Sequence, residues 1–405
     1  MSLIFSTITL SFLFNVLRKR KKRFVYLVLI STFSLCLFSL ILNLYLKNVI
    51  GWEYGVAGAD LSAHFNAAKA IDSGFKIDQL YLVHYRFEMN FQNLCYFIYS
   101  YILYVFLYCP TIIDIEFSLH IFYFVQILIA VLSSINFADF FAKEDKYKKY
   151  IFIFFISCSA IGQMASVLMR DIWIVFFMSL YFLELKKEKK RLSIIIVLNI
   201  ILFILRNYMI FITIPLFFHY FFPNKKYDLI SSFSLTGVLI FGNQIISNFA
   251  RLFSIRWVFD FDFNVLSLFE FFMFPNILTQ SYNVQHPNTS YHYLFGGNTE
   301  FIYYLLACWN CFVYPVCIYG FYKNLKYKNI RETCIWGIMI INIALLYGIF
   351  YDSVSEPRHK LMIIYSLAYF YSIGISKINK KILIILWMII FYSLFFIYIL
   401  KGTII

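Results

Sequence analysis

The sequence predicts an all-α integral membrane protein with about 11 to 12 transmembrane helices. Of its 405 residues, 62% are hydrophobic, 22% aromatic and only 14% charged, and a soluble domain could not bury so much apolar surface. Apolar runs of about 15 to 25 residues recur along the whole chain, which is the length needed to cross a hydrocarbon core ~30 Å thick. The run from Ile382 to Leu400 is apolar on every face, whereas a barrel strand alternates, so the spans are expected to be helices.

The basic residues predict the orientation of these helices. The formal charge is +14, and the Lys and Arg residues gather in short clusters beside apolar runs. This pattern is typical of a cytoplasmic membrane face, so we expect membrane lipids and no nucleic acid as partners. The clusters are Arg18 to Arg23, Lys143 to Lys149, Lys186 to Arg191, Lys225 and Lys226, Lys323 to Arg331, and Lys377 to Lys381.

The first apolar run, Met1 to Val16, is followed rather than preceded by basic residues, so it is expected to stay as a short helix and not to be a cleaved signal peptide. Further helices are predicted at 24–46, 150–168, 172–185, 192–205, 208–222, 229–246, 301–322, 333–351, 361–375 and 382–400. The external face then receives two larger loops, 47–92 and 247–300, together with the Arg170-Asp171 turn, the Arg206-Asn207 turn and the loop 352–360. No internal repeat or long linker is visible, so residues 1–405 are expected to form one polytopic domain.

The apolar runs 93–109 and 117–139 do not fit this arrangement. They lie between an external loop and a cytoplasmic cluster, and two crossings cannot change sides. Either one of them is a re-entrant or half-crossing helix, or the cluster at Lys143 breaks the rule.

A first candidate site lies in "GADLSAHFNAAKAIDSG", residues 58 to 74, which has the start and stop signals of a short helix. In a helix Asp60 and His64 share one face with Ala67 and Ile71. One interpretation makes Asp60 an N-cap and His64 an interfacial histidine. The other makes them a catalytic base and its partner, because deprotonating a sugar hydroxyl requires such a group within hydrogen-bond reach.

Arginines interrupt two other apolar stretches. Arg170 and Asp171 lie in "SVLMRDIWIVFFMSL", where they form either the polar turn of a helical hairpin or part of a cavity. Arg206 lies in "LFILRNYMIF" with about ten apolar neighbours on each side. Since Arg is always protonated and holds phosphate oxygens with a two-pronged fork, this position suits a diphosphate.

The last cluster is "YDSVSEPRHKLMIIYSLAYF". Pro357 suits the first turn of a helix, which leaves Arg358 and His359 near its positive end, where an anion is favoured. The alternative is a charged loop that caps two helices. No metal site is predicted, because Asp60 and His64 are only two ligands and Cys308 and Cys311 have no second pair at ligand spacing; no cofactor is expected.

Taken together, "GADLSAHFNAAKAIDSG", "HYRFEMNFQNLCYFIYSYI", "LMRDIWIVFFMSLYF" and "EPRHKLMIIYSL" resemble the bacterial O-antigen and capsule repeat-unit polymerases, within the GT-C superfamily of polyprenyl-sugar-dependent glycosyltransferases. The resemblance implies a GT-C-like fold in the bacterial inner membrane. It also implies an enzyme of polysaccharide biosynthesis that joins polyprenyl-diphosphate-linked oligosaccharide units, for lipopolysaccharide or capsule, on the external face.

The resemblance also implies roles for particular residues. Asp60, with His64, takes the place of the acid of the first external loop, although no second acid stands beside Asp60. Arg170, Arg206 and Arg358 hold the diphosphate, with Asp171 and His359 in the same substrate site. Contact with other polysaccharide assembly proteins is left open.

Three other functions stay open. A transferase of the same superfamily could add a single sugar from polyprenyl phosphate. A flippase of the lipid-linked unit would favour paired repeats and helices broken by Gly or Pro, and with 14 Gly and 7 Pro the sequence shows neither. A structural assembly partner would tolerate alanine at Asp60, Arg206 and Arg358.

Overall fold

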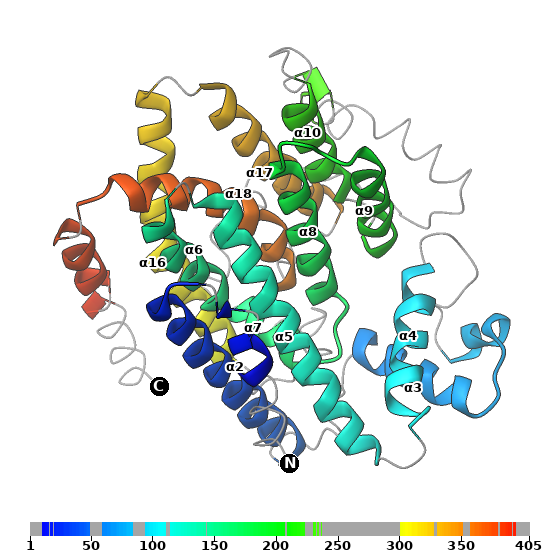
Figure 1. The fold of residues 1–405 in the computed structure, drawn as a ribbon. Coiled ribbons are helices and arrows are strands. Elements are labelled where there is room, and N and C mark those ends of the chain that lie inside the picture. The colour runs from blue at the N-terminus through cyan, green and yellow to red at the C-terminus, as the bar shows by residue number, and fades with distance from the viewer. Residues whose placement is uncertain are drawn as a thin grey trace.

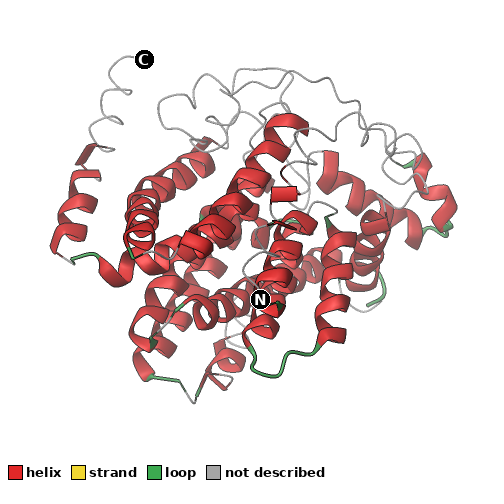
Figure 2. Ribbon diagram, turned by 90° about the horizontal axis from the view of Figure 1, so that it is seen from above, coloured by secondary structure: helices red, strands yellow, loops and turns green. Residues whose placement is uncertain are grey.

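Every regular element that the computed structural model describes is a helix (Figure 2). The described residues are 10–48, 59–83, 94–110, 114–222, 230–236, 300–327, 330–350 and 357–393, apart from 16, 19, 143, 207, 208, 232, 235, 380 and 391. The helices are α2 (Lys22–Asn48), α3 (Ala59–Asp72), the 3-10 helix η2 (Ile77–Leu82), α4 (Leu94–Leu107), α5 (Ile115–Phe141), α6 (Asp145–Ile156), α7 (Ser159–Ser166), α8 (Asp171–Lys186), α9 (Leu192–Leu205), α10 (Ile210–Phe221), α16 (Glu300–Lys326), α17 (Ile330–Phe350) and α18 (Pro357–Lys377).

Helix α5 is the centre of the bundle (Figure 1). Helices α2, α4, α6, α7, α8 and α18 all pack against it, and 72% of its apolar stretch is buried, against 39% for α2. Aromatic side chains fill its second half, where Phe137 stacks on Phe155 with ring centroids 4.4 Å apart and meets Phe182 edge to face. The abundance of Phe is therefore used for close contacts between helices in the core.

Ion pairs show which helix ends lie together. At the end of α5, Asp139 accepts a hydrogen bond of 2.8 Å from Arg20, just before α2, and one of 3.0 Å from Lys148 in α6. At its start, Glu116 lies 2.6 Å from Lys47 in the last turn of α2. Helices α2 and α5 are thus antiparallel. The basic clusters Arg18 to Arg23, Lys143 to Lys149 and Lys186 to Arg191 lie at one end of this pair, where Lys186 donates to the carbonyl of Phe140. We call it the basic end.

This pairing resolves the conflict between the apolar runs 93–109 and 117–139. The chain leaves α2 and enters α5 at the same end of the bundle, so the segment between them makes no net crossing. Helix α4 has only 14 residues, about 21 Å at 1.5 Å per residue, and it packs on α3 beside that end. The half-crossing alternative fits this arrangement, in which the cluster at Lys143 lies at the same end of the bundle as the cluster at Arg18.

Two described helices are long and apolar enough to cross a membrane, Lys22–Leu44 within α2 and Ile115–Phe141. A third span results if α6 and α7, which meet at 59°, count as one. The sequence predicts one helix at 150–168 for this stretch. The described residues thus account for two or three of the expected 11 to 12 crossings, because helices such as α8, α9 and α10 have only 12 to 16 residues. Most of the predicted helix 229–246 and nearly all of the loop 247–300 lie outside the described residues.

Apolar side chains also cover outward-facing helix surfaces. On α2, six of them recur at spacings of three and four residues and are 46% to 65% exposed: Tyr26, Ile30, Phe33, Leu37, Ile41 and Leu44. The outward face of α9 carries a similar row, with Ile196, Val197 and Ile200 about half exposed. Continuous apolar faces of this kind are suited to lipid and indicate membrane association.

The crossing of α16 and α18 depends on two glycines. A methyl group at Gly320 would lie 1.9 Å from the backbone oxygen of Phe370, and one at Gly374 would lie 2.1 Å from that of Val316. Small residues let helix backbones approach closely, as in many membrane helix pairs. Helix α18 packs against both α6 and α7, and α16 packs against α7.

Candidate functional site

Helix α3 forms where the sequence predicts a short helix. It spans Ala59–Asp72, and Gly74 follows with a φ of 88°. The amide of Gly74 donates to the carbonyl of Ile71, and that of Phe75 to the carbonyl of Ala70, each at 3.0 Å. This pair of bonds closes the helix in a Schellman motif, whose left-handed position favours glycine.

The alanines of α3 bring it close to α4. Ala63, Ala67 and Ala70 are buried in a small apolar cluster with Cys95, Tyr96 and Phe97 of α4. Ile204 near the end of α9 also packs on this cluster. The polar, alanine-rich helix α3 thus packs with α4 beside the end of α9.

His64 projects from this helix into the interface and is only 2% exposed. Its Nδ1 lies 3.1 Å from Ser100 Oγ. Its ring stacks on Tyr96 at 4.9 Å between centroids and meets Tyr99 edge to face at 4.8 Å. His64 is therefore buried and oriented by α4, and does not lie at an open cavity lip; Asp60 lies one turn earlier in α3, and its side chain is outside the described residues.

Arg170 enters the same cluster from the turn between α7 and α8. Its guanidinium is 7% exposed, donates to Cys95 Sγ and lies 4.1 Å from the centroid of the Tyr96 ring. Among the described residues no carboxylate forms an ion pair with it, and the contacts just given are to a thiol and an aromatic face. The Asp171 carboxylate is close enough to attract this guanidinium, but it also pairs with Arg206. Two buried cations thus share one carboxylate, which is costly unless a further anion or a dipole compensates.

Asp171 and Arg206 form a buried ion pair beside Arg170. Arg206 Nη2 donates to Asp171 Oδ1 at 2.9 Å, and the two side chains are 9% and 2% exposed. Arg206 follows the last residue of α9 and Asp171 is the first residue of α8. The pair therefore joins two helix ends that point away from the basic end.

Gln126 of α5 ties this cluster to the central helix. Its Nε2 donates to the carbonyl of Met169 at 3.2 Å and lies 3.4 Å from the Tyr99 hydroxyl. Tyr365 of α18 also lies near the Asp171 carboxylate. We call His64, Tyr96, Arg170, Asp171 and Arg206 the charged cluster.

The structure thus brings four of the seven predicted site residues together. The Arg170 and Arg206 turns lie away from the basic end, as predicted, and both arginines are buried, which disfavours the polar-turn interpretation of Arg170 and Asp171. Helices α8 and α9 are about 24 and 21 Å long, whereas α5 is about 40 Å long. The two turns therefore lie part-way along α5, where helices α3 and α4 cover them. Arg358 and His359 lie in the first turn of α18, which begins at Pro357 as predicted, and their side chains are outside the described residues.

Sequence reasoning did not single out the neutral members of the site. Cys95, Tyr96, Tyr99 and Ser100 all fall in the stretch "HYRFEMNFQNLCYFIYSYI", which was noticed only as a whole. The pair Tyr99 and Ser100 follows the pair Cys95 and Tyr96 by three to five residues, which places the four on one side of a helix. Gln126 is an isolated amide in an apolar run. These two signals could have identified the partners of the arginines.

No protein-family model, curated protein or solved structure matches this chain. Among the described residues there is also no group of three His, Cys, Asp or Glu that could hold a metal ion. The chemistry of the site must therefore be argued from its own residues. Two guanidiniums, one carboxylate and an oriented imidazole in a dry interior form a site suited to an anion and to proton transfer beside it.

Proposed function

We propose that this protein is a membrane glycosyltransferase that polymerises polyprenyl-diphosphate-linked oligosaccharide units, of O-antigen or capsule, at the external face of the bacterial inner membrane. The basic end then faces the cytoplasm, as the positive-inside rule requires. The row of exposed apolar residues on α2 contacts lipid, and the polyprenyl chain approaches from the bilayer. The fold on this proposal is a GT-C-like arrangement of many spans.

The observation that carries the proposal is the environment of Arg170. Its buried guanidinium lies against a thiol and an aromatic ring and shares the Asp171 carboxylate with a second guanidinium. The net positive charge that remains supports a site for an anion that enters without its water. A diphosphate attached to a lipid reaches such a depth because the lipid itself is apolar. Arg170 would hold its oxygens, and Asp171 would keep Arg206 in position beside them.

The reaction on this proposal is a single displacement. An acceptor sugar hydroxyl forms a bond to the anomeric carbon of the donor while the bond from that carbon to the diphosphate oxygen breaks. The hydroxyl proton passes to His64 or Asp60, and the lipid diphosphate leaves with its negative charge stabilised by Arg170 and Arg206. Such preorganised cations contribute most where water is excluded.

The test is the length distribution of surface polysaccharide on a gel. A deletion strain is complemented with wild type, Arg170→Gln or Arg170→Lys at matched membrane levels. We expect wild type to restore a long ladder, Arg170→Gln to leave single repeat units, and Arg170→Lys to give a shortened ladder because Lys lacks the fork.

Arg191→Gln is the matched control, because Arg191 is an exposed arginine at the basic end that pairs with Glu184. It should leave the ladder unchanged. A ladder that persists in the deletion strain, or that Arg170→Gln restores in full, contradicts the proposal. A deletion that alters the repeat unit itself indicates the single-sugar transferase.

The bend between α6 and α7 favours a second candidate, a flippase of the lipid-linked unit. Discontinuous helices mark substrate sites in many transporters, and this bend was not expected from the sequence. It lies at Ser157 and Cys158, only 12 residues before Arg170. Reconstitution in liposomes with the lipid-linked oligosaccharide distinguishes the two: a transferase lengthens the glycan, whereas a flippase changes only the leaflet from which an added glycosidase can reach it.

A further inference from the structure

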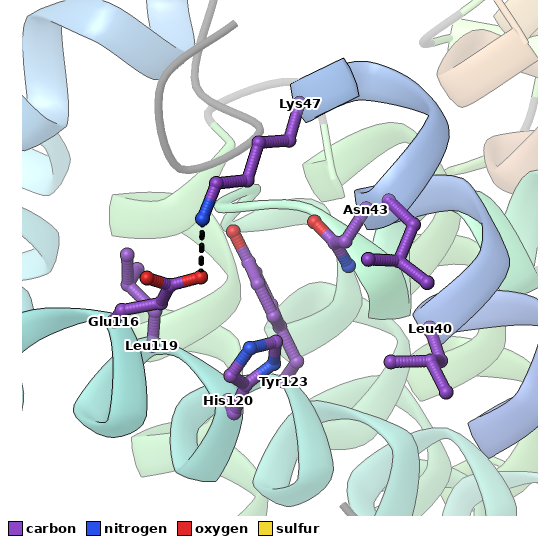
Figure 3. A pocket seen from close by; sticks show the side chains of 8 residues that line it. Leu40, Asn43, Lys47, Glu116, Leu119, His120 and Tyr123 are labelled. Atoms are coloured by element: carbon purple, nitrogen blue, oxygen red, sulfur yellow. Dashed lines mark hydrogen bonds and ion pairs between the residues drawn. The ribbon is translucent and has the colours of Figure 1, made fainter. Parts of the chain in front are cut away.

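A pocket outside the charged cluster lies between the last turns of α2 and the first turns of α5, away from the basic end (Figure 3). The space in it that water-sized molecules can reach is about 70 Å³, several times what one water needs, and the pocket is partly open, which suits one edge of a larger ligand. Five polar residues line it, Asn43, Lys47, Glu116, His120 and Tyr123, together with three leucines. None of the seven predicted site residues belongs to it.

Asn43 supplies the strongest indication of a ligand. Its side chain is only 9% exposed, and its Nδ2 donates to the carbonyls of Ser39 at 2.8 Å and Ser166 at 3.2 Å. These two bonds fix the amide, whose Oδ1 is buried and has no hydrogen-bond partner among the described residues. Figure 3 shows this oxygen on the side of the Tyr123 hydroxyl and Lys47. A buried acceptor without a donor is unfavourable, and a hydroxyl group in the pocket would supply that donor.

The charges around the pocket limit the class of ligand. Lys47 and Glu116 lie 2.6 Å apart at the rim and are both 46% exposed, so the rim carries no excess positive charge for a phosphate. His120 and Glu116 alone do not complete a metal site. Donors and acceptors interleaved with leucine side chains instead suit a sugar ring, which has hydroxyls around its edge and C–H groups on its faces.

The pocket is also connected to the charged cluster. Glu116, His120, Tyr123 and Gln126 follow one another at spacings of four, three and three residues, so they share one face of α5. Along this face the distance from Glu116 to Gln126 is about 15 Å. Gln126 contacts the carbonyl beside Arg170, and its own Oε1 is a second buried acceptor without a hydrogen-bond partner in the described part of the chain.

From these observations we infer that the pocket between α2 and α5 binds a sugar residue of the acceptor glycan. The inference rests on the proposed transfer reaction, since it assigns the acceptor glycan of that reaction to a pocket separate from the charged cluster. The acceptor then sits on the polar face of α5, and the donor diphosphate lies at the charged cluster, about three helical turns further along.

The test measures glycan binding without turnover. The probe is the oligosaccharide released by mild acid from the lipid-linked precursors of the source cells, which has lost its phosphate. Saturation-transfer NMR with the full-length protein in nanodiscs gives its affinity. We expect Asn43→Leu to weaken binding roughly five- to tenfold, the effect of one lost hydrogen bond.

Since Asn43 also supports the backbone of α7, Tyr123→Phe serves as a second variant that removes one hydroxyl and keeps the ring. It should weaken binding by a smaller factor, roughly threefold. Asn199→Leu in α9 is the matched control for an Asn-to-Leu change in a helix, and it should bind as wild type does.

Either of two results overturns the inference: wild type that gives no saturation transfer, or folded Asn43→Leu and Tyr123→Phe proteins that both bind as wild type does. A failure of the transfer reaction looks different. In that case wild type binds the glycan and Asn43→Leu binds it more weakly, but no polymer forms from the lipid-linked unit.

Discussion

The ion pairs at the basic end and in the charged cluster differ in burial. At the basic end, Arg20 and Asp139 have side chains 37% and 21% exposed, whereas those of Arg206 and Asp171 are 9% and 2% exposed. Exposed pairs contribute at most about 1 kcal/mol. Buried pairs are costly relative to apolar packing, although breaking one is costlier still. The ion pairs at the basic end therefore contribute little to stability, whereas the buried pair of the charged cluster is costly enough to need a functional reason.

The largest effect is expected from Asp171→Asn. This change leaves Arg206 buried without its carboxylate, so the free energy of unfolding should fall by about 3 to 5 kcal/mol. Unfolding by SDS titration in mixed micelles measures it. A loss below about 1 kcal/mol would mean that the cluster is hydrated and that the contrast with the basic end does not hold.

A double substitution separates the fold from the function of the same pair. Asp171→Leu with Arg206→Met replaces both charges by apolar side chains, which is often neutral or stabilising. We expect it to recover most of the stability lost in Asp171→Asn but to make no polymer in the gel assay. Recovery of the polymer as well would show that the pair has only a structural role.

The contact of Arg170 with Tyr96 should have a smaller effect. A cation–π contact contributes about 0.5 to 2 kcal/mol, so Tyr96→Leu should lower the free energy of unfolding by about that amount. Tyr101→Leu on the same helix is the control, because Tyr101 is 49% exposed and such surface changes usually stay within ~0.5 kcal/mol. If the free energy of unfolding fell equally in Tyr96→Leu and Tyr101→Leu, the contact between Arg170 and Tyr96 would contribute nothing, as expected for an arginine in a polar environment.

Much of the local structure could be predicted from the sequence. The helix that ends before Gly74 and the helix that begins at Pro357 follow from local start and stop signals. The basic clusters at Arg18, Lys143 and Lys186 were predicted to share one side, and the contacts of Arg20, Lys148 and Lys186 with the last turn of α5 confirm this. These features depend on a few neighbouring residues or on a charge bias that needs no packing.

Burial and helix breaks could not be predicted in the same way. The burial of Arg170 and Arg206 depends on α8 and α9 being shorter than α5 and on α3 and α4 lying over their ends. The bend at Ser157 carries no Gly or Pro, so the usual sequence signal of a break is missing. The pocket between α2 and α5 joins residues about 70 positions apart, which no local pattern relates.

The smallest loss in the free energy of unfolding is expected at the basic end. Its dependence on salt concentration should differ most clearly from that of the charged cluster. The pKa of Arg20 is raised by its hydrogen bonds to Asp139, so the arginine stays charged at any practical pH and ionic strength is the useful variable. Asp139→Asn should lower the free energy of unfolding by only about 0.5 to 1 kcal/mol at low salt. The loss should vanish near 1 M salt, where the Debye length falls to about 3 Å. The loss in Asp171→Asn should persist at 1 M salt, because mobile ions do not enter the interior where that pair lies. Equal salt dependence in the two variants would contradict the distinction between a solvated and a buried set of charges.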